Sequence, residues 1–172
     1  MLTNGDVSMI FDPFLTGNTW DIEKKEDIKC QYIFVSHGHD DHYGDTEFIA
    51  KANDALVIST AEVAGKAAAA GCRTHAMHLG GKYDFEFGSI RIVPAFHGAG
   101  VPGGHAAGCI VNFFGDIVYF AGDTALFSDM KLLNRFGDID YALRPIGDNY
   151  TMGVEDAALA ASYVKARISI PI

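Results

Sequence analysis

The sequence predicts a mixed α/β (α+β) fold in which sheets stack and helices cover their outer faces. Apolar stretches of strand length recur along the 172 residues, and tight-turn sequences separate several neighbouring pairs. Helical patterns enter between the later strands, so hairpins give way to alternating strands and helices. The composition, 49% hydrophobic and 20% charged, is that of an ordinary globular protein. We expect a single domain, residues 1–172, around one sizeable core.

The strands are predicted from apolar runs that end at turn residues. Asn4-Gly5 is a strong hairpin signal, but only three residues precede it, which we interpret as too few for a partner strand. Asp12-Pro13 ends the strand that follows, and Gly88 and Gly115-Asp116 mark two further hairpins. The expected strands are residues 7–11, 28–36, 55–60, 82–87, 89–94, 109–114, 117–121, 139–143 and 168–172.

Four helices are predicted where helix-forming residues follow a capping or turn residue. Asp45 can cap the first of them, because its carboxylate can accept hydrogen bonds from the free N–H groups of the first turn. An alanine-rich run ends at Gly71, a residue type that commonly closes a helix. The predicted helices are residues 46–52, 61–70, 128–135 and 154–165, and a glycine-rich loop spans residues 98–108.

Composition also bounds the partners and the compartment. The net charge of −9 argues against nucleic acid, which requires a basic face. No apolar run approaches the ~20 residues that span a bilayer, and the N-terminus lacks the pattern of a signal peptide. Cys30, Cys72 and Cys109 are odd in number and far apart, so we interpret them as free thiols. We expect a cytoplasmic protein without a membrane or nucleic-acid partner; a homo-oligomer is compatible with the sequence.

The densest group of candidate ligands follows the apolar run Ile33-Phe34-Val35. His37, His39, Asp41 and His42 form the pattern HxHxDH at the predicted end of a strand. Imidazole and carboxylate groups suit zinc, manganese or iron. A polar turn rich in these residues is the alternative, but three histidines within six residues argue against it. His97 and Asp123 each follow another apolar run, so three strand ends carry ligand-type residues.

Together these motifs resemble the metallo-β-lactamase superfamily of hydrolases. One branch is particularly similar, the uncharacterised metal-dependent hydrolases related to the ascorbate-phosphate lactonase. The segments that carry the resemblance are "DPFLTGN" (12–18), "SHGHDDHYGDT" (36–46), "AGDTALFSDMKL" (121–132) and "PIGDNYTMGVEDAALAA" (145–161). The resemblance implies a four-layer αββα sandwich with two divalent metal ions, zinc first among the candidates, at one edge of the sheets.

The resemblance also assigns ligands by position. His37, His39 and His97 would bind the first metal, Asp41 and His42 the second, and Asp123 would bridge both, while Asp12 would support the ligand loop from beneath. The family's final ligand is a histidine just after a strand similar to "ISIPI" (168–172), and its opening strand carries Gly-His-Ser; both lie outside this sequence. We therefore expect the domain to be truncated at both ends, with the second metal position one ligand short.

The predicted activity is hydrolysis of an ester, lactone or phosphodiester in a small molecule by a metal-activated water, with Asp41 and Asp123 at the reacting centre. An anionic substrate is one option. Two other functions stay open: a mononuclear iron oxidative enzyme of the persulfide-oxidising type, and a non-catalytic relic that binds a metabolite.

Three further residues are candidates for substrate contact or for support of the ligands: His105, Arg144 and Asp148. Ordinary surface, salt-bridge or turn roles would also explain them.

Overall fold

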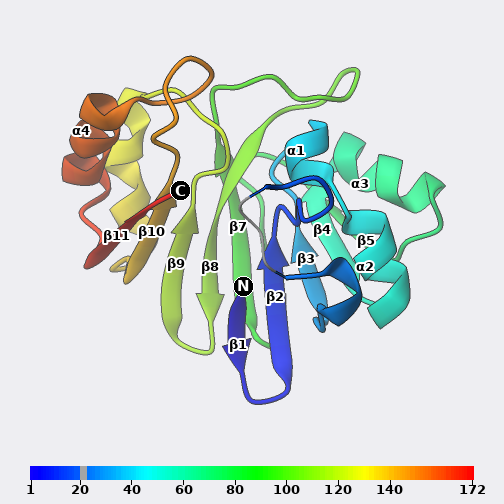
Figure 1. Cartoon of the computed structure of the whole chain (residues 1–172). Helices are drawn as coiled ribbons and strands as arrows, with labels where there is room; N and C mark the ends of the chain where they lie inside the picture. Colours follow the sequence, from blue (N-terminus) through cyan, green and yellow to red (C-terminus); the bar gives the residue numbers. More distant parts are fainter. Residues whose placement is uncertain (20–22) are drawn as a thin grey trace. The chain divides into compact units, whose positions relative to one another are not determined.

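The computed structural model describes residues 1–19 and 23–172 and divides the chain into two compact units. Unit 1 comprises Met1–His78 and Gly98–His105, and unit 2 comprises Leu79–His97 and Ala106–Ile172. Each unit contains one sheet and its own helices (Figure 1). The predicted mixed α/β class with two sheets is confirmed, whereas the stacking of these sheets into four layers stays a prediction.

The sheet of unit 1 is mainly parallel. Its five strands lie in the order β1-β2-β3-β4-β5; only β1 and β2 are antiparallel. The strands are β1 Leu2–Asn4, β2 Val7–Phe11, β3 Tyr32–Phe34, β4 Leu56–Thr60 and β5 Thr74–Met77. Because β2 to β5 run in one direction, the segments that follow these four strands all leave from the same edge of the sheet.

The N-terminal hairpin corrects one expectation. Three residues before the turn do suffice for a partner strand, since Leu2–Asn4 pairs with β2 in the register Asn4↔Val7. The two-residue turn is Gly5-Asp6 rather than Asn4-Gly5, and Gly5 has a φ of 57°. A side chain is disfavoured in that conformation, which explains glycine at this position.

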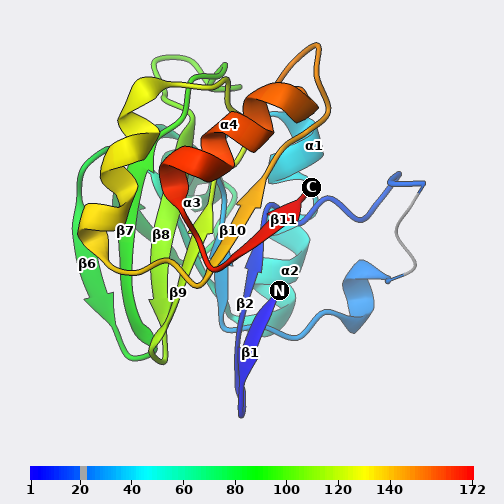
Figure 2. The ribbon, with the colours of Figure 1, turned by 90° about the vertical axis from the view of Figure 1, so that its left-hand side faces the viewer.

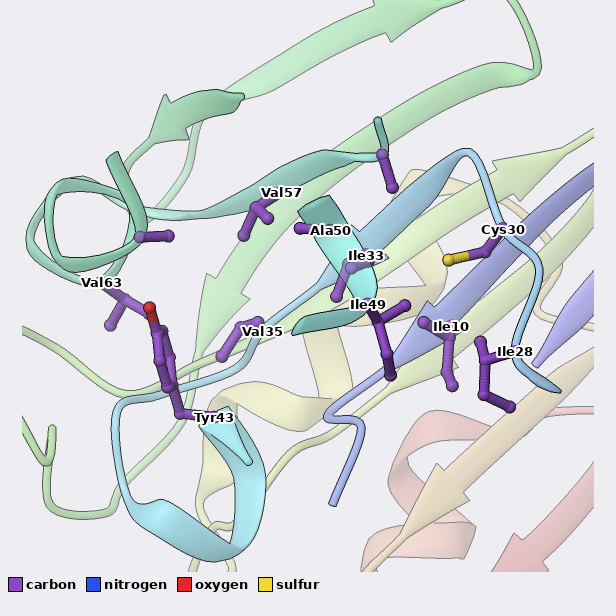
Figure 3. Close-up of a cluster of buried hydrophobic side chains, with 12 residues drawn as sticks. Ile10, Ile28, Cys30, Ile33, Val35, Tyr43, Ile49, Ala50, Val57 and Val63 are labelled. Atoms are coloured by element: carbon purple, nitrogen blue, oxygen red, sulfur yellow. The ribbon is translucent and has the colours of Figure 1, made fainter. Parts of the chain in front are cut away.

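The helices of unit 1 cover one face of its sheet. They are η1 Lys25–Asp27, α1 Asp40–Tyr43, α2 Thr46–Asn53 and α3 Ala61–Ala69. α2 and α3 pack on β3, β4 and β5. Figure 3 shows the resulting core, in which Ile33 and Val35 alternate along one strand segment and meet Ile49 of α2 and Val63 of α3. This burial of an apolar face fixes the strand ends from which the ligand residues emerge.

Unit 2 contains a mixed sheet of six strands in the order β11-β10-β9-β8-β7-β6. The strands from β6 to β9 form antiparallel pairs, and β9, β10 and β11 are parallel. The bounds are β6 Lys82–Phe85, β7 Gly88–Pro94, β8 Ala107–Phe113, β9 Asp116–Phe120, β10 Tyr141–Arg144 and β11 Ile168–Pro171. The turn between β8 and β9 is Phe114-Gly115, one residue earlier than predicted.

Two helical segments, α4 and the one before β10, pack against each other and bury side chains against the sheet of unit 2 (Figure 2). α4 is Val154–Val164, and the other, η2 Ser128–Phe136, is a 3₁₀ helix. Met130 and Leu133 of η2 are its buried residues and lie three positions apart. A 3₁₀ helix has three residues per turn, so both side chains face the core. No helix within the described ranges has both the length and the apolar character needed to cross a bilayer.

The predicted cap of α2 is wrong. Asp45 occupies the position before the helix, but its carboxylate makes no capping hydrogen bond. It instead accepts hydrogen bonds from Leu15 N at 3.0 Å, from Thr16 N and Oγ1 at 2.7 Å each, and from Lys25 Nζ at 3.1 Å. Asp45 thus ties the segment after β2 to the start of α2. Burial alone would raise the pKa of this carboxyl, but the hydrogen bonds, led by those from Thr16, outweigh burial and lower it.

We predict that Asp45→Asn lowers the free energy of unfolding by about 1–3 kcal/mol near neutral pH, because charge-assisted hydrogen bonds are lost in a buried setting. The pKa of Asp45 is lower in the folded than in the unfolded state, so its contribution exists above the unfolded pKa of about 3.9 and is lost as the pH falls through the folded value. Chemical denaturation at neutral and acidic pH measures both effects.

Asp54→Asn is the matched control for this prediction. Asp54 pairs with Arg73 at 2.9 Å, but the two side chains are 80% and 60% exposed, so the loss should stay within about 1 kcal/mol. Equal destabilisation by the two substitutions, or a difference that grows at acidic pH, would contradict the role given to Asp45.

Candidate metal centre

The first part of the predicted centre lies where β3 ends. The chain stays fully buried through Ser36 and His37 before α1 begins. His37 Nδ1 lies 2.8 Å from Ser36 Oγ, and His37 Nε2 lies 2.9 Å from His39 Nδ1. Two imidazole nitrogens therefore face each other across a short gap. The two nitrogens share a hydrogen bond in this structure, and a cation that replaces the shared proton could be bound by both.

A carboxylate beneath this segment fixes the protonation of two imidazole rings. Asp12, whose side chain is 6% exposed, accepts hydrogen bonds from Ser36 N at 2.7 Å, Ser36 Oγ at 2.5 Å and His42 Nδ1 at 2.7 Å. Because Ser36 Oγ donates its only proton to Asp12, it accepts one from His37 Nδ1. With Nδ1 of each ring engaged in this way, Nε2 is the atom that His37 and His42 can offer to a metal.

The same contacts distinguish a support from a ligand. Asp12, His37 and His42 each offer a ligand atom within 4.8 Å of the others. Three protein donors already bind the two oxygens of Asp12, whereas the Nε2 atoms of both histidines point away from these donors. The chemistry of the set therefore favours the histidines as ligands and Asp12 as the group that orients them.

The loop Gly98–His105 belongs to the same unit and packs against the histidine segment. Gly38 N donates a hydrogen bond to Ala99 O at 2.8 Å. A Cβ added at Gly98 would lie 3.2 Å from His39 Cε1, and one added at Gly100, whose φ is 66°, would lie 2.3 Å from His39 N. Glycine is therefore required where the loop backbone approaches His39.

Unit 2 contains the other two predicted ligands, His97 and Asp123, which follow β7 and β9. His97 Nε2 lies 3.6 Å from Asp123 Oδ2, and the two side chains are 13% and 20% exposed. This separation is too long for a hydrogen bond, and it leaves an imidazole and a carboxylate side by side. Thr124 fixes the two segments relative to each other, since Phe96 N donates to Thr124 Oγ1 at 3.0 Å and Ala125 N donates to Phe96 O at 3.1 Å.

The predicted ligand Asp41 is exposed in the first turn of α1. Its Oδ2 lies 4.0 Å from His42 Nε2, on the side of the ring opposite to the nitrogen that Asp12 holds. The side chain of Asp41 is 65% exposed, against 17% for His42. The pair therefore presents one imidazole nitrogen and one carboxylate towards solvent.

The three weaker candidates lie in different surroundings. His105 is exposed, and its carbonyl accepts a hydrogen bond from Thr60 Oγ1 at 3.3 Å. Asp148 lies in a turn before α4, with φ 60°, and its carboxylate accepts from Asn149 N at 2.8 Å. Arg144 is 5% exposed and lines an apolar pocket with Ala157 of α4; burial lowers its pKa.

Sequence reasoning missed two residues that position these groups. Ser36 transmits the hydrogen bonding of Asp12 to His37, and Thr124 joins the segments that carry His97 and Asp123. Both hydroxyl residues stand directly beside a predicted ligand, within "SHGH" and "GDT". That adjacency was the available signal, but the partners of each hydroxyl lie 24 and 28 positions away in the sequence.

Comparison with known families and sequences gives consistent matches. A family model described as a β-lactamase superfamily domain matches residues 10–172. A UPF0173 metal-dependent hydrolase of Natranaerobius thermophilus is 49% identical over 171 residues, covering 99% of this chain and 77% of that protein. The UPF0173 metal-dependent hydrolase YtkL of Bacillus subtilis is 46% identical over 176 residues, covering 97% of this chain and 78% of that protein.

Solved structures match over nearly the same length. Igni18, a metallo hydrolase from the archaeon Ignicoccus hospitalis, aligns with a TM-score of 0.89 and 28% identity, covering 98% of this chain and 76% of that one. The metallo-β-lactamase fold protein YhfI of Bacillus subtilis aligns with a TM-score of 0.72 and 12% identity, over 98% and 76% of the two chains. The second likeness concerns the fold alone.

We predict that Gly100→Ala weakens zinc binding at His37 and His39 by about tenfold or more, the range seen when groups around a metal ligand are disturbed. The added Cβ would collide with His39 N and push the loop away from the histidine segment. Competition with a chelating dye measures the affinity.

Gly103→Ala is the control, because Gly103 also has a positive φ, 74°, but no atom would lie within 4 Å of its added Cβ. The two substitutions impose similar backbone strain and differ in the collision with His39. Equal zinc affinities in the two variants would contradict the packing role of Gly100.

Proposed function

The chain belongs to the β-lactamase superfamily, among its metal-dependent hydrolases, and from this membership we propose that it uses two divalent cations, zinc first, to hydrolyse an ester, lactone or phosphodiester bond in a small molecule. The observation that carries the proposal is the pair of nitrogens, His37 Nε2 and His39 Nδ1, which face each other while Ser36 and Asp12 fix the ring of His37.

The donor atoms fit zinc. Ligands held at roughly 2.0–2.1 Å from a tetrahedral ion are about 3.3 Å apart. The 2.9 Å between His37 Nε2 and His39 Nδ1 is slightly shorter, so a small opening of the two rings would admit a cation. His97 Nε2 and Asp123 Oδ2, 3.6 Å apart, offer one nitrogen and one oxygen at similar spacing.

Chain continuity supports the joining of these pairs. His97 is bonded to Gly98, and consecutive Cα atoms are about 3.8 Å apart. Gly98 belongs to unit 1 and stands beside the imidazole ring of His39. We propose that His97 joins His37 and His39 at the first cation, that Asp41 and His42 hold the second, and that Asp123 lies between the two.

The residues would then divide the chemistry. Two cations, when bound, would supply the chemistry of lowering the pKa of a water towards neutrality and of polarising the oxygen on which negative charge develops. Asp12 and Ser36 keep the rings of His37 and His42 in the tautomer that presents Nε2. Asp123 holds its carboxylate beside His97, and Asp41, as the more exposed ligand, lies nearest to an incoming substrate.

Nucleophilic side chains near the centre are poorly placed for covalent catalysis. Ser36, His37 and Asp12 have the residue types of a catalytic triad, but the serine is fully buried and donates its proton to the aspartate instead of the histidine. Ser59 is also buried and donates to Val35 O at 2.6 Å. Cys30 lies at the other end of β3, before Tyr32, and burial raises the pKa of its thiol to about 11. A water nucleophile agrees with these contacts.

The test is a screen of lactones, phosphodiesters and thioesters with zinc, manganese or iron added back to metal-free protein. Hydrolysis restored by zinc or manganese supports the proposal. Substrate oxidation that requires iron and oxygen would replace it with an oxidative function, and metabolite binding without turnover would replace it with the non-catalytic one.

We predict that Asp123→Ala lowers kcat/KM at saturating metal by at least about a hundredfold, since changes around a metal ligand already cost 10–100-fold. The fold should persist, because Asp123 lies in a loop after β9 rather than in the core. Steady-state kinetics and a circular dichroism melt test the two parts. Asp129→Ala, which alters an exposed carboxylate in η2, should keep wild-type kinetics; similar losses in both variants would refute the bridging role.

A further inference from the structure

We propose that Glu62, His78 and His105 form an additional cation site within unit 1, which takes zinc and clips the loop Gly98–His105 to the end of β5. These residues are distinct from those assigned to the hydrolytic centre. The site does not depend on the proposed activity, because none of its three residues belongs to the His37, His39 or His42 set.

The parallel pairing of β4 and β5 brings two of the residues together. Thr60, the last residue of β4, lies opposite Met77, the last residue of β5. α3 begins immediately after Thr60, so Glu62 in its first turn and His78 after Met77 leave the same edge of the sheet from adjacent strands. The backbone of the sheet therefore determines that these two side chains are neighbours.

The loop supplies the third residue. Thr60 Oγ1 donates to His105 O at 3.3 Å, which ties the end of the loop to the start of α3. The rings of His78 and His105 have centroids 5.3 Å apart, with an angle of 55° between their planes. One ligand atom from each of Glu62, His78 and His105 lies within 4.8 Å of the other two.

The donor set suits zinc with one open coordination position. Two imidazoles and one carboxylate are a known set of three protein ligands, to which a water adds the fourth. Binding requires the donor atoms to close to about 3.3 Å. His78 and His105 are both exposed, so their rings can rotate to this spacing.

An oxygen of Glu62 independently indicates a missing ligand. Glu62 Oε2 has less than 1 Å² of accessible surface, and among the described residues it has no hydrogen-bond partner. The position of Glu62 in the first turn of α3 favours a negative charge, but it does not supply a donor to this atom. A carboxylate oxygen that is removed from water is normally paired with a donor or a cation, and a cation shared with His78 and His105 would satisfy it.

Occupancy of this site would restrain a loop that packs against His39. One end of the loop is held through the Gly38 N to Ala99 O hydrogen bond, and the other lies at His105. Between them, a Cβ added at Gly104 would lie 3.4 Å from Glu62 Cβ, so the loop passes close to α3. A cation at His105 would fix the second end and limit the motion of the backbone beside His39.

The first experiment counts bound zinc. Metal-free protein is equilibrated with zinc, and zinc per chain is measured by elemental analysis in a background that carries His37→Ala and His39→Ala. Glu62→Gln, His78→Ala and His105→Ala should each remove one equivalent that the background retains. His75→Ala is the control, because His75 lies on β5 outside the cluster and should retain that equivalent. Equal zinc content in all four variants would overturn the proposal.

The second experiment measures the loop. Subtilisin, a protease of broad specificity, is added to the same background with and without zinc, and cleavage within residues 98–105 is followed by mass spectrometry. Zinc should slow this cleavage severalfold, and His105→Ala should abolish the protection while His75→Ala preserves it. Unchanged cleavage on zinc addition would refute the clip. Loss of hydrolysis in the background itself concerns the hydrolytic centre alone, so the two proposals fail separately.

Discussion

The carboxylate of Asp12 is the interaction on which the candidate metal centre depends. It holds Ser36 through both backbone and side chain, and it holds His42 through Nδ1. Through Ser36 it also sets the proton on His37. One carboxylate thus orients His42 directly and His37 through Ser36. Such a charge is tolerated in the interior because every contact it makes is a hydrogen bond to a donor.

The strands explain why this carboxylate reaches its partners. β2 and β3 are adjacent and parallel, with Phe11 opposite Phe34, so Asp12 and Val35 to His37 leave the same edge together. Asp12 N also donates to Phe34 O at 3.0 Å, which extends the pairing past the last residue of β2. The apolar core beneath α2 and α3 holds these strands in register, and the ligand geometry follows from that packing.

The sequence predicts the parts of the molecule whose signals are local. An apolar run followed by histidine or aspartate is visible for His37, His97 and Asp123 without knowledge of the fold. Contacts between distant segments are not visible in this way, and for that reason the role of Asp45 was mistaken and Thr124 was missed. The sequence did not predict β5, whose four residues are "THAM". Only its methionine is strongly apolar, so the segment lacks the run of apolar residues that indicates a strand.

The loop Gly98–His105 has consequences for how the protein can diversify. Gly98 and Gly100 stand against His39, so variation there would damage the ligands. Pro102, by contrast, is exposed, and Gly103 has open space around it. A side chain at position 102 can therefore change without a collision with His39, whereas positions 98 and 100 require glycine. New side chains at this exposed turn would alter the outer surface of the loop and leave the backbone packing beside His39 intact.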